Sequence, residues 1–289
     1  MLSAPRRLLL VHAHPDDETI CNGGTIARYA AAGVHVTLVT CTLGEEGEVI
    51  PDELRGLAAD SADQLGGYRV GELRAACTAL GIADQRFLGG IGRWRDSGMT
   101  GTTANRHPRA FVNGSLDEQV HELAKIVAEV RPQVVVSYDP SGGYGHPDHV
   151  RAHRVTMAAV DGAREVDAVF WTVVSRSTVR DGLAGLAGFD GLPFALPTPD
   201  EVPCVPDDLV TTTVDVGAAL PAKVAALRAH ATQISVWEGS SDGQRSYALS
   251  NGLARPLGPV EEFTLAGGRV AADQVRSDLF GGSGPGGEQ

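Results

Sequence analysis

Apolar and polar positions alternate along the first 175 residues in a way that predicts strands and helices in turn. Short apolar runs bounded by polar residues or glycine are typical of buried strands, and longer stretches with apolar residues three or four apart are typical of helices. The expected strands are 7–13, 34–42, 86–88, 134–138 and 168–174. The expected helices are 21–32, 54–80 with a break at Gly66-Gly67, 116–130 and 148–160. This alternation predicts an α/β fold: a Rossmann-like, mostly parallel sheet with helices on both faces.

The pattern changes after about residue 175. Residues 182–206 are rich in glycine and proline and are expected to wind over the surface. A strand is predicted over 210–216 and a helix over 218–231, with Pro221 in the first helical turn, where proline is tolerated. We therefore expect a catalytic core over 1–175, a smaller C-terminal strand and helix segment over 176–280 packed on it in the same domain, and a disordered tail over 281–289.

The composition narrows the class of protein. Of the 289 residues, 43% are hydrophobic, enough for a sizeable core, and the formal net charge is −12. A nucleic-acid partner would need a basic face, so this acidity argues against one. No apolar stretch approaches a membrane span, and the run after Arg6-Arg7 is too short for a signal peptide, so we expect no membrane partner. The four cysteines lack the paired spacing of a metal site and suit a reducing cytoplasm, where we place the protein.

Two similar polar motifs follow two of the predicted strands. His14-Pro15-Asp16-Asp17-Glu18 comes directly after the strand that contains the apolar run 8–11, and His146-Pro147-Asp148-His149 follows the run 134–136. Open α/β sheets place their active sites at the carboxyl ends of the strands. If the two strands are neighbours or nearly so, the motifs form one site with several imidazoles and carboxylates.

A catalytic metal site is the interpretation that we favour for these motifs. A catalytic zinc takes three protein ligands and leaves a position for water. His14 and Asp17, three positions apart where a strand meets a helix, can point at one place, and His149 can supply the third ligand. Two histidines and one carboxylate suit zinc or iron(II). The alternative is that Asp17 is only a helix cap, which the presence of two similar motifs disfavours.

The remaining polar residues of the motifs then have natural roles. Asp16 can accept a proton from water that the metal has made more acidic. A protonated His146, held by the carboxylate of Asp148, could stabilise an oxyanion or protonate a leaving amine, although Asp148 could instead cap a helix. Tyr144, in the glycine-rich loop 142–145, could add a hydrogen bond to the oxyanion or simply pack on the surface.

Other histidines are weaker candidates. His12 lies on the same strand face as His14 and is either adjacent to the metal site or a core histidine. His153 is four residues after His149, a spacing that can share a metal, but it ranks below Asp17 because the first motif has no equivalent. His230, like the remaining histidines, receives no role from the sequence.

The motifs resemble those of the LmbE-like/PIG-L zinc de-N-acetylases, which hydrolyse an acetamide from N-acetylglucosaminyl compounds. The sequence is most similar to the members of this family that act in mycothiol biosynthesis in actinobacteria, on an N-acetylglucosaminyl-inositol. The similarity also covers segments 41–50, 62–69, 92–99, 222–227 and 230–233, and so spans most of the chain.

The resemblance implies roles for particular residues. The implied zinc ligands are His14, Asp17 and His149, with one ion per subunit and Fe²⁺ as the alternative in the cell. The implied catalytic residues are Asp16 as general base, His146 as oxyanion or acid group, Tyr144 as a mobile oxyanion donor and Asp148 as the group that tunes His146. The implied sugar contacts are Arg69 and Asp96, since a guanidinium donates to hydroxyls and a carboxylate accepts from them, with Glu48 and Met99 lining the pocket.

The expected function is zinc-dependent removal of the acetyl group from N-acetylglucosaminyl-inositol, at an amide bond that is not a peptide bond. The close alternative is the mycothiol S-conjugate amidase of the same family, which shares the metal-site residues and cleaves a larger acyl group. An iron(II) oxygenase uses a similar ligand triad, but the alternation of strands and helices disfavours that class. A sugar-binding protein with a structural metal would not need Asp16 and His146. The sequence leaves open whether the protein forms a homo-oligomer.

Overall fold

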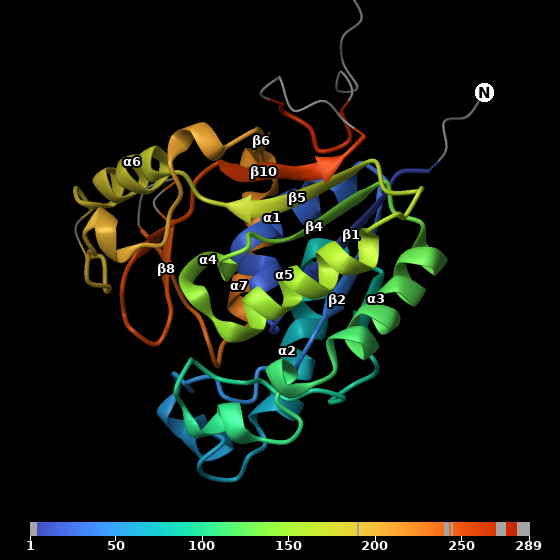
Figure 1. The fold of residues 1–289 in the computed structure, drawn as a ribbon. Coiled ribbons are helices and arrows are strands. Elements are labelled where there is room, and N and C mark those ends of the chain that lie inside the picture. The colour runs from blue at the N-terminus through green and yellow to red at the C-terminus, as the bar shows by residue number, and fades with distance from the viewer. Residues whose placement is uncertain (1–4, 190, 240–242, 244, 270–275, 282–289) are drawn as a thin grey trace, which may run out of the picture.

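The chain is built around a seven-stranded sheet in the order β3-β2-β1-β4-β5-β10-β6 (Figure 1). The computed structural model describes residues 5–189, 191–239, 243, 245–269 and 276–281. Five strands are parallel: β1 (Arg7–His12), β2 (His35–Thr40), β3 (Asp84–Phe87), β4 (Val134–Tyr138) and β5 (Ala168–Val173). β10 (Val260–Gly268) runs antiparallel to β5, and β6 (Thr212–Asp215) runs antiparallel to β10. The predicted α/β fold with a mostly parallel sheet is confirmed.

Helices cover both faces of this sheet, as expected. One face carries α1 (Asp17–Ala31), α2 (Leu65–Leu80) and α7 (Leu220–Ala229), and the other carries α3 (Leu116–Val130) and α5 (Pro147–Val160) (Figure 1). Strands that are buried on both sides appear as continuous apolar runs. In β1, Leu8 and Leu10 join the core on the α1 side, whereas Leu9 and Val11 join the core on the α3 side.

The chain folds differently from the expectation at two places. The helix predicted over 54–80 is wrong at its start: a 3₁₀ turn, η1 (Asp52–Leu57), comes first and α2 begins at Leu65. Gly66 does not break the helix but allows close packing, because a Cβ there would lie 2.7 Å from the side chain of Glu45. The surface winding predicted for 182–206 is wrong in part, because α6 (Arg176–Leu186) extends into it, capped by Ser175.

The C-terminal part also contains elements that were not predicted. A second sheet joins β7 (Ser235–Glu238), β8 (Arg245–Ala248) and β9 (Arg255–Pro256). Short helices in this part are η4 (Pro199–Glu201), η5 (Asp207–Leu209) and η6 (Gly217–Ala219). Earlier in the chain, η2 (Thr103–Arg106), η3 (Phe111–Asn113) and α4 (Gly142–Gly145) were not predicted either. The predicted tail lies outside the described residues from 282 onward, and the division of the chain at residue 175 stays a prediction. None of the helices in the described part of the chain combines the length and the hydrophobicity of a membrane span.

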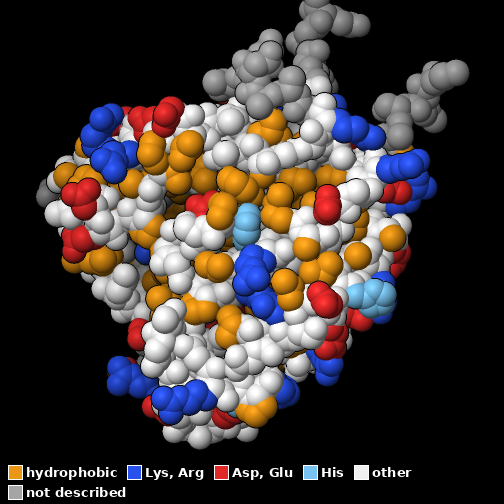
Figure 2. All heavy atoms as spheres, in the orientation of Figure 1, with side chains coloured by type: hydrophobic (Ala, Val, Ile, Leu, Met, Phe, Trp, Pro, Cys, Tyr) orange, Lys and Arg blue, Asp and Glu red, His pale blue; other side chains and the backbone are white. Residues whose placement is uncertain are grey.

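The order of the strands determines where a site can form. β1 pairs with β4 in parallel, with Leu8 opposite Val134, and the chain leaves the two strands toward different sides of the sheet. Ligand sites of open α/β sheets lie at such a switch point, beyond the carboxyl ends of the strands. On the face shown in Figure 2, hydrophobic side chains are scattered across the middle with a histidine and a basic group among them, and acidic and basic side chains are interspersed, so the excess of acidic residues is not gathered on this face.

Candidate active site

The two polar motifs meet at the carboxyl ends of β1 and β4. His14 lies in the loop between β1 and α1, His146 is the N-cap of α5, and His149 lies in the first turn of α5. The ring centroids of His14 and His146 are 4.6 Å apart, and those of His146 and His149 are 5.2 Å apart. One ring nitrogen of each of the three histidines lies within 4.8 Å of the other two.

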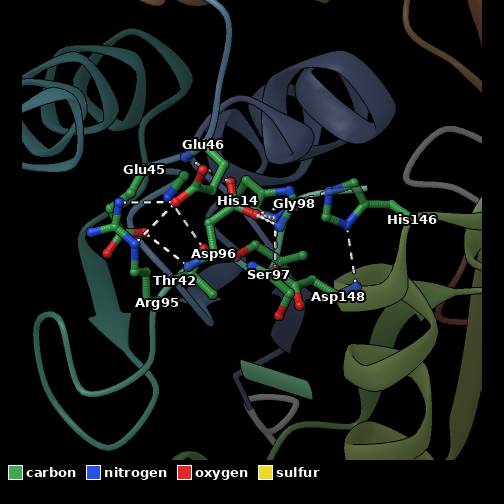
Figure 3. Close-up of polar contacts among 12 residues, drawn as sticks. His14, Thr42, Glu45, Glu46, Arg95, Asp96, Ser97, Gly98, His146 and Asp148 are labelled. Carbon is green, nitrogen blue, oxygen red and sulfur yellow. Dashed lines mark hydrogen bonds and ion pairs between the residues drawn. The ribbon is translucent and has the colours of Figure 1, made fainter. Parts of the chain in front are cut away.

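Hydrogen bonds orient the two predicted histidine ligands. Nε2 of His14 lies 3.3 Å from Oδ2 of Asp148 and 3.4 Å from Oδ1 of Asp96, so Nε2 faces two hydrogen-bond acceptors and Nδ1 is the nitrogen that can bind a metal (Figure 3). Nδ1 of His149 lies 3.2 Å from the carbonyl oxygen of Gly142, which leaves Nε2 with a lone pair. A partner on the far nitrogen is how proteins orient imidazoles toward metals.

The other nitrogens of these two histidines converge on one carboxylate oxygen. Oδ2 of Asp17 is 3.4 Å from Nδ1 of His14 and 3.4 Å from Nε2 of His149. Nε2 of His149 is buried and has no hydrogen-bond partner within the described part of the chain. A buried polar atom without a partner is costly, and a cation between these three ligand atoms would remove that cost. Two nitrogens and an oxygen therefore fit a divalent metal ion.

Asp17 is held by a residue that sequence reasoning missed. Tyr138, the last residue of β4, donates its hydroxyl to Oδ2 of Asp17 over 2.7 Å, and its ring stacks on that of His149 with centroids 4.1 Å apart. The available signal was its place at the end of the strand that leads to the second motif. Asp17 is not a helix cap, since α1 begins at Asp17 and its N-cap residue is Asp16.

Asp16 lies beside the convergent ligand atoms with a buried arginine as its partner. Nη2 of Arg69 is 2.9 Å from Oδ2 of Asp16. The same guanidinium donates to the carbonyl oxygens of Gly44, over 2.8 Å, and of Pro15. Burial raises the pKa of Asp16 to about 6, against the opposing effect of Arg69. A carboxylate with that pKa can accept a proton near neutral pH.

The predicted pairing of Asp148 with His146 is wrong. Nδ1 of His146 accepts the backbone N–H of Asp148 over 3.2 Å, whereas the Asp148 carboxylate accepts the N–H of Ser97 over 2.9 Å and faces His14 (Figure 3). His146 is therefore the cap of α5, and Asp148 supports His14 instead. Burial and the neighbouring imidazoles of His14 and His149 lower the pKa of His146 to about 3, so this ring is neutral and carries its proton on Nε2.

Three of the four predicted substrate residues lie around a cavity of about 430 Å³. Arg69, Asp96, Met99 and Tyr144 line it, the last with 53% of its surface exposed. Glu48 does not line it: Glu48 is exposed, and Glu46 and Gly47 take that place in the wall. The far wall comes from the C-terminal part of the chain, through residues such as Val179, Lys223, Pro256 and Glu261.

Three further histidines lie outside the group of convergent ligand atoms. His12 is a buried core residue whose Nε2 is 3.0 Å from Oδ1 of Asn22. Nδ1 of His153 is 2.9 Å from the carbonyl oxygen of Tyr138. His230, to which the sequence assigned no role, is fully buried with Nε2 only 2.8 Å from Oε1 of Glu18.

Comparisons with known proteins agree with this geometry. The profile of the family described as PIG-L: GlcNAc-PI de-N-acetylase matches residues 9–160. The 1D-myo-inositol 2-acetamido-2-deoxy-alpha-D-glucopyranoside deacetylase of Actinosynnema mirum is 62% identical over 283 residues, which are 98% of this chain and 99% of that protein. The protein named 1D-myo-inositol 2-acetamido-2-deoxy-alpha-D-glucopyranoside deacetylase 1 of Saccharopolyspora erythraea is 59% identical over 100% of this chain and 98% of its own. Among solved structures, the 4-carboxy-2-hydroxymuconate hydratase of Pseudomonas putida is similar in fold, with a TM-score of 0.57 at 19% identity over 92% of this chain and 98% of that chain.

Proposed function

Because the chain belongs to the PIG-L family of GlcNAc-PI de-N-acetylases, we propose that it hydrolyses the acetamide of 1D-myo-inositol 2-acetamido-2-deoxy-α-D-glucopyranoside. The observation that carries the proposal is the convergence of Nδ1 of His14 and Nε2 of His149 on one oxygen of Asp17, in the wall of a cavity that Asp16 also lines. Relatives of that name extend over nearly the whole chain, including the C-terminal wall of the cavity, which favours the deacetylase over the conjugate amidase.

His14, Asp17 and His149 are the proposed ligands of a catalytic metal ion. Zinc is the proposed metal, because two imidazoles and one carboxylate leave a position open for water and substrate, and Fe²⁺ is the alternative. When bound, such an ion acts as a Lewis acid on the acetyl carbonyl and increases the acidity of water. Tyr138 and Asp148 keep the ligand atoms in place through their contacts with Asp17 and His14.

Asp16 is the proposed general base. Its carboxylate accepts a proton from the water that attacks the acetyl carbon, and Arg69 holds the carboxylate at the cavity wall. As the C–N bond breaks, the same group returns the proton to the amine. We assign the return step to Asp16 rather than to His146, because Nδ1 of His146 is already an acceptor for the N–H of Asp148.

His146 and Tyr144 are the proposed donors to the developing oxyanion. Nε2–H of His146 and the hydroxyl of Tyr144 lie in the same cavity wall, with ring centroids 6.0 Å apart. Hydrogen bonds to an oxyanion stabilise the transition state more than the ground state, so they increase kcat.

Asp96, Arg69 and Met99 are the proposed contacts of the sugar. Asp96 accepts the N–H of Gly98 over 2.8 Å, which fixes a carboxylate at the cavity wall where hydroxyls can donate to it.

The four cysteines are free thiols, which supports the proposed location in the reducing cytoplasm.

The test is release of free amine by the zinc-loaded protein from the acetylated glucosaminyl-inositol, with a mycothiol S-conjugate assayed in parallel. We expect release from the first substrate, its loss after chelation, and its return on adding zinc or Fe²⁺. Preferential cleavage of the conjugate would show that the activity is that of the amidase and not that of the deacetylase. Absence of amine release from both substrates by the metal-loaded protein would reject the proposal.

A further inference from the structure

Asp16 has a backbone conformation that the surrounding residues must impose. It is the N-cap of α1, with φ 110° and ψ −33°. Residues other than glycine rarely adopt a positive φ, and they keep it only where neighbouring contacts determine it. The direction of the Asp16 carboxylate therefore depends on whatever holds the peptide group before it.

That peptide group, between Pro15 and Asp16, is held at both of its ends. The guanidinium of Arg69 donates to the carbonyl oxygen of Pro15. The N–H of Asp16 donates to Oε2 of Glu18 over 3.0 Å. These two contacts orient the peptide plane, and the plane sets φ of Asp16.

Glu18 is in turn held by His230. Both side chains are fully buried, and Nε2 of His230 lies 2.8 Å from Oε1 of Glu18. His230 is the C-cap residue of α7, where the helix dipole favours a donor or cationic group. Oε1 of Glu18 thus faces His230 and accepts the hydroxyl of the adjacent Thr19, while Oε2 accepts the N–H of Asp16.

The segment that begins at His230 is anchored to the helix that carries Arg69. Thr232 donates its N–H and its hydroxyl to the two oxygens of Glu72, over 2.8 and 2.7 Å. Glu72 lies in α2, one helical turn after Arg69. Arg69, which holds one end of the Asp16 peptide, and His230, which holds the other end through Glu18 of α1, therefore belong to one packed unit of α2 and the end of α7.

We infer that His230 is a positioning residue for catalysis, which acts through Glu18 to hold the Asp16 carboxylate in its proton-accepting orientation. The inference rests on the proposed function, in which Asp16 is the base. His230 is not among the residues that line the cavity, so it touches neither the sugar nor the acetyl group. Its loss should change kcat rather than KM.

The experiment compares His230→Gln with His230→Asn. The amide nitrogen of glutamine can take the position of Nε2 and donate to Glu18, whereas that of asparagine falls short of it. We expect kcat of His230→Gln to stay within a few-fold of wild type. We expect kcat of His230→Asn to fall roughly 10- to 100-fold, as for other misplaced catalytic groups, with KM and bound metal per subunit unchanged. His121→Gln, at an exposed position of α3, is the matched control and should behave as wild type.

A second variant keeps the inference testable if His230→Asn does not fold. Glu18→Gln places an amide group opposite Nε2 of His230, and we expect a similar loss of kcat at constant metal content. The inference is overturned if Gln and Asn at position 230 lose kcat equally, if the loss appears in KM or metal content, or if Glu18→Gln keeps wild-type kcat. Inactivity of the metal-loaded wild-type protein would instead reject the proposed function.

Discussion

At the scale of single residues, Asp16 combines burial, a charged partner and an unusual backbone conformation. Burial raises its pKa to about 6, and Arg69 holds its carboxylate at the cavity wall. Because a base must be ionised to accept a proton, we expect kcat/KM to rise with pH through about 6. The rise should disappear in Asp16→Asn. A pH profile of kcat/KM for both proteins checks this, and a rise kept by Asp16→Asn would assign it to another group.

Replacement of Asp16 should separate catalysis from metal binding. Asp16→Ala removes the proposed base but none of the three proposed ligands. We expect turnover to fall by several orders of magnitude while the bound metal per subunit is kept. Steady-state kinetics together with elemental analysis checks both parts. Turnover within a few-fold of wild type would contradict the assignment of the base.

Asp148 offers a test of which histidine it supports. Its carboxylate lies 3.3 Å from Nε2 of His14. His146 instead accepts a hydrogen bond from the backbone N–H of Asp148. Carboxylates that hydrogen-bond to a metal-binding imidazole increase metal affinity about 10- to 100-fold. Asp148→Asn should therefore weaken zinc binding by that factor, as measured by competition with a chelator. Unchanged affinity combined with a loss of kcat would instead connect Asp148 to His146.

At the scale of secondary-structure elements, a buried ion pair joins α7 and β10 to the middle of α1. Nζ of Lys223 is 2.7 Å from Oε1 of Glu261, and Glu261 accepts the N–H groups of Gly24 and Thr25 over 2.8 and 2.7 Å. Gly24 has no room for a Cβ, which would lie 2.6 Å from Val216. The close approach of α1 to the C-terminal elements thus requires glycine at this position.

Removing one partner of this pair should destabilise the fold. Lys223→Met leaves the Glu261 carboxylate buried without its cation, and we expect the free energy of unfolding to fall by about 3–5 kcal/mol. Lys125, which pairs with Glu122 at the same 2.7 Å but is exposed, is the matched control. Lys125→Met should cost less than about 1 kcal/mol. Urea unfolding of both variants checks this. Equal losses of unfolding free energy would contradict the expectation that the buried pair contributes more than the exposed pair.

At the scale of the whole molecule, residues far apart in the chain build the active site together. The proposed metal ligands come from the loop after β1, the start of α1 and the start of α5, while β10 lies next to β5 and brings Glu261 to the cavity. The last third of the chain therefore supplies one part of the cavity wall, and the two polar motifs supply another. This arrangement agrees with the relatives whose similarity covers 98% of this chain or more.

A metal that joins β1, α1 and α5 should stabilise the whole fold. A ligand that binds only the folded state at 100 times its Kd adds about 2.7 kcal/mol to the free energy of unfolding. We expect chelation to lower the melting temperature and zinc to restore it. His149→Ala should remove this dependence on zinc. Calorimetry of both proteins with and without zinc checks this, and a zinc effect that persists in His149→Ala would place the ion elsewhere.

The sequence by itself determined the parts of this protein that rest on local patterns. The runs 116–130 and 134–138 have the bounds of α3 and β4, because amphipathic and apolar periodicities are properties of neighbouring residues. The motifs at 14–18 and 146–149 were recognisable because each combines metal-binding and proton-transferring residue types directly after a buried strand.

Only the tertiary structure decided which distant groups meet. Nothing local in the sequence indicates that Asp148 faces His14 rather than His146, that Glu48 lies outside the cavity, or that β10 pairs antiparallel with β5. The partnership of Glu18 with His230 joins residues 212 positions apart. Such contacts depend on how the helices pack over the sheet, since side-chain orientation and burial are set by the whole fold and not by the neighbouring sequence.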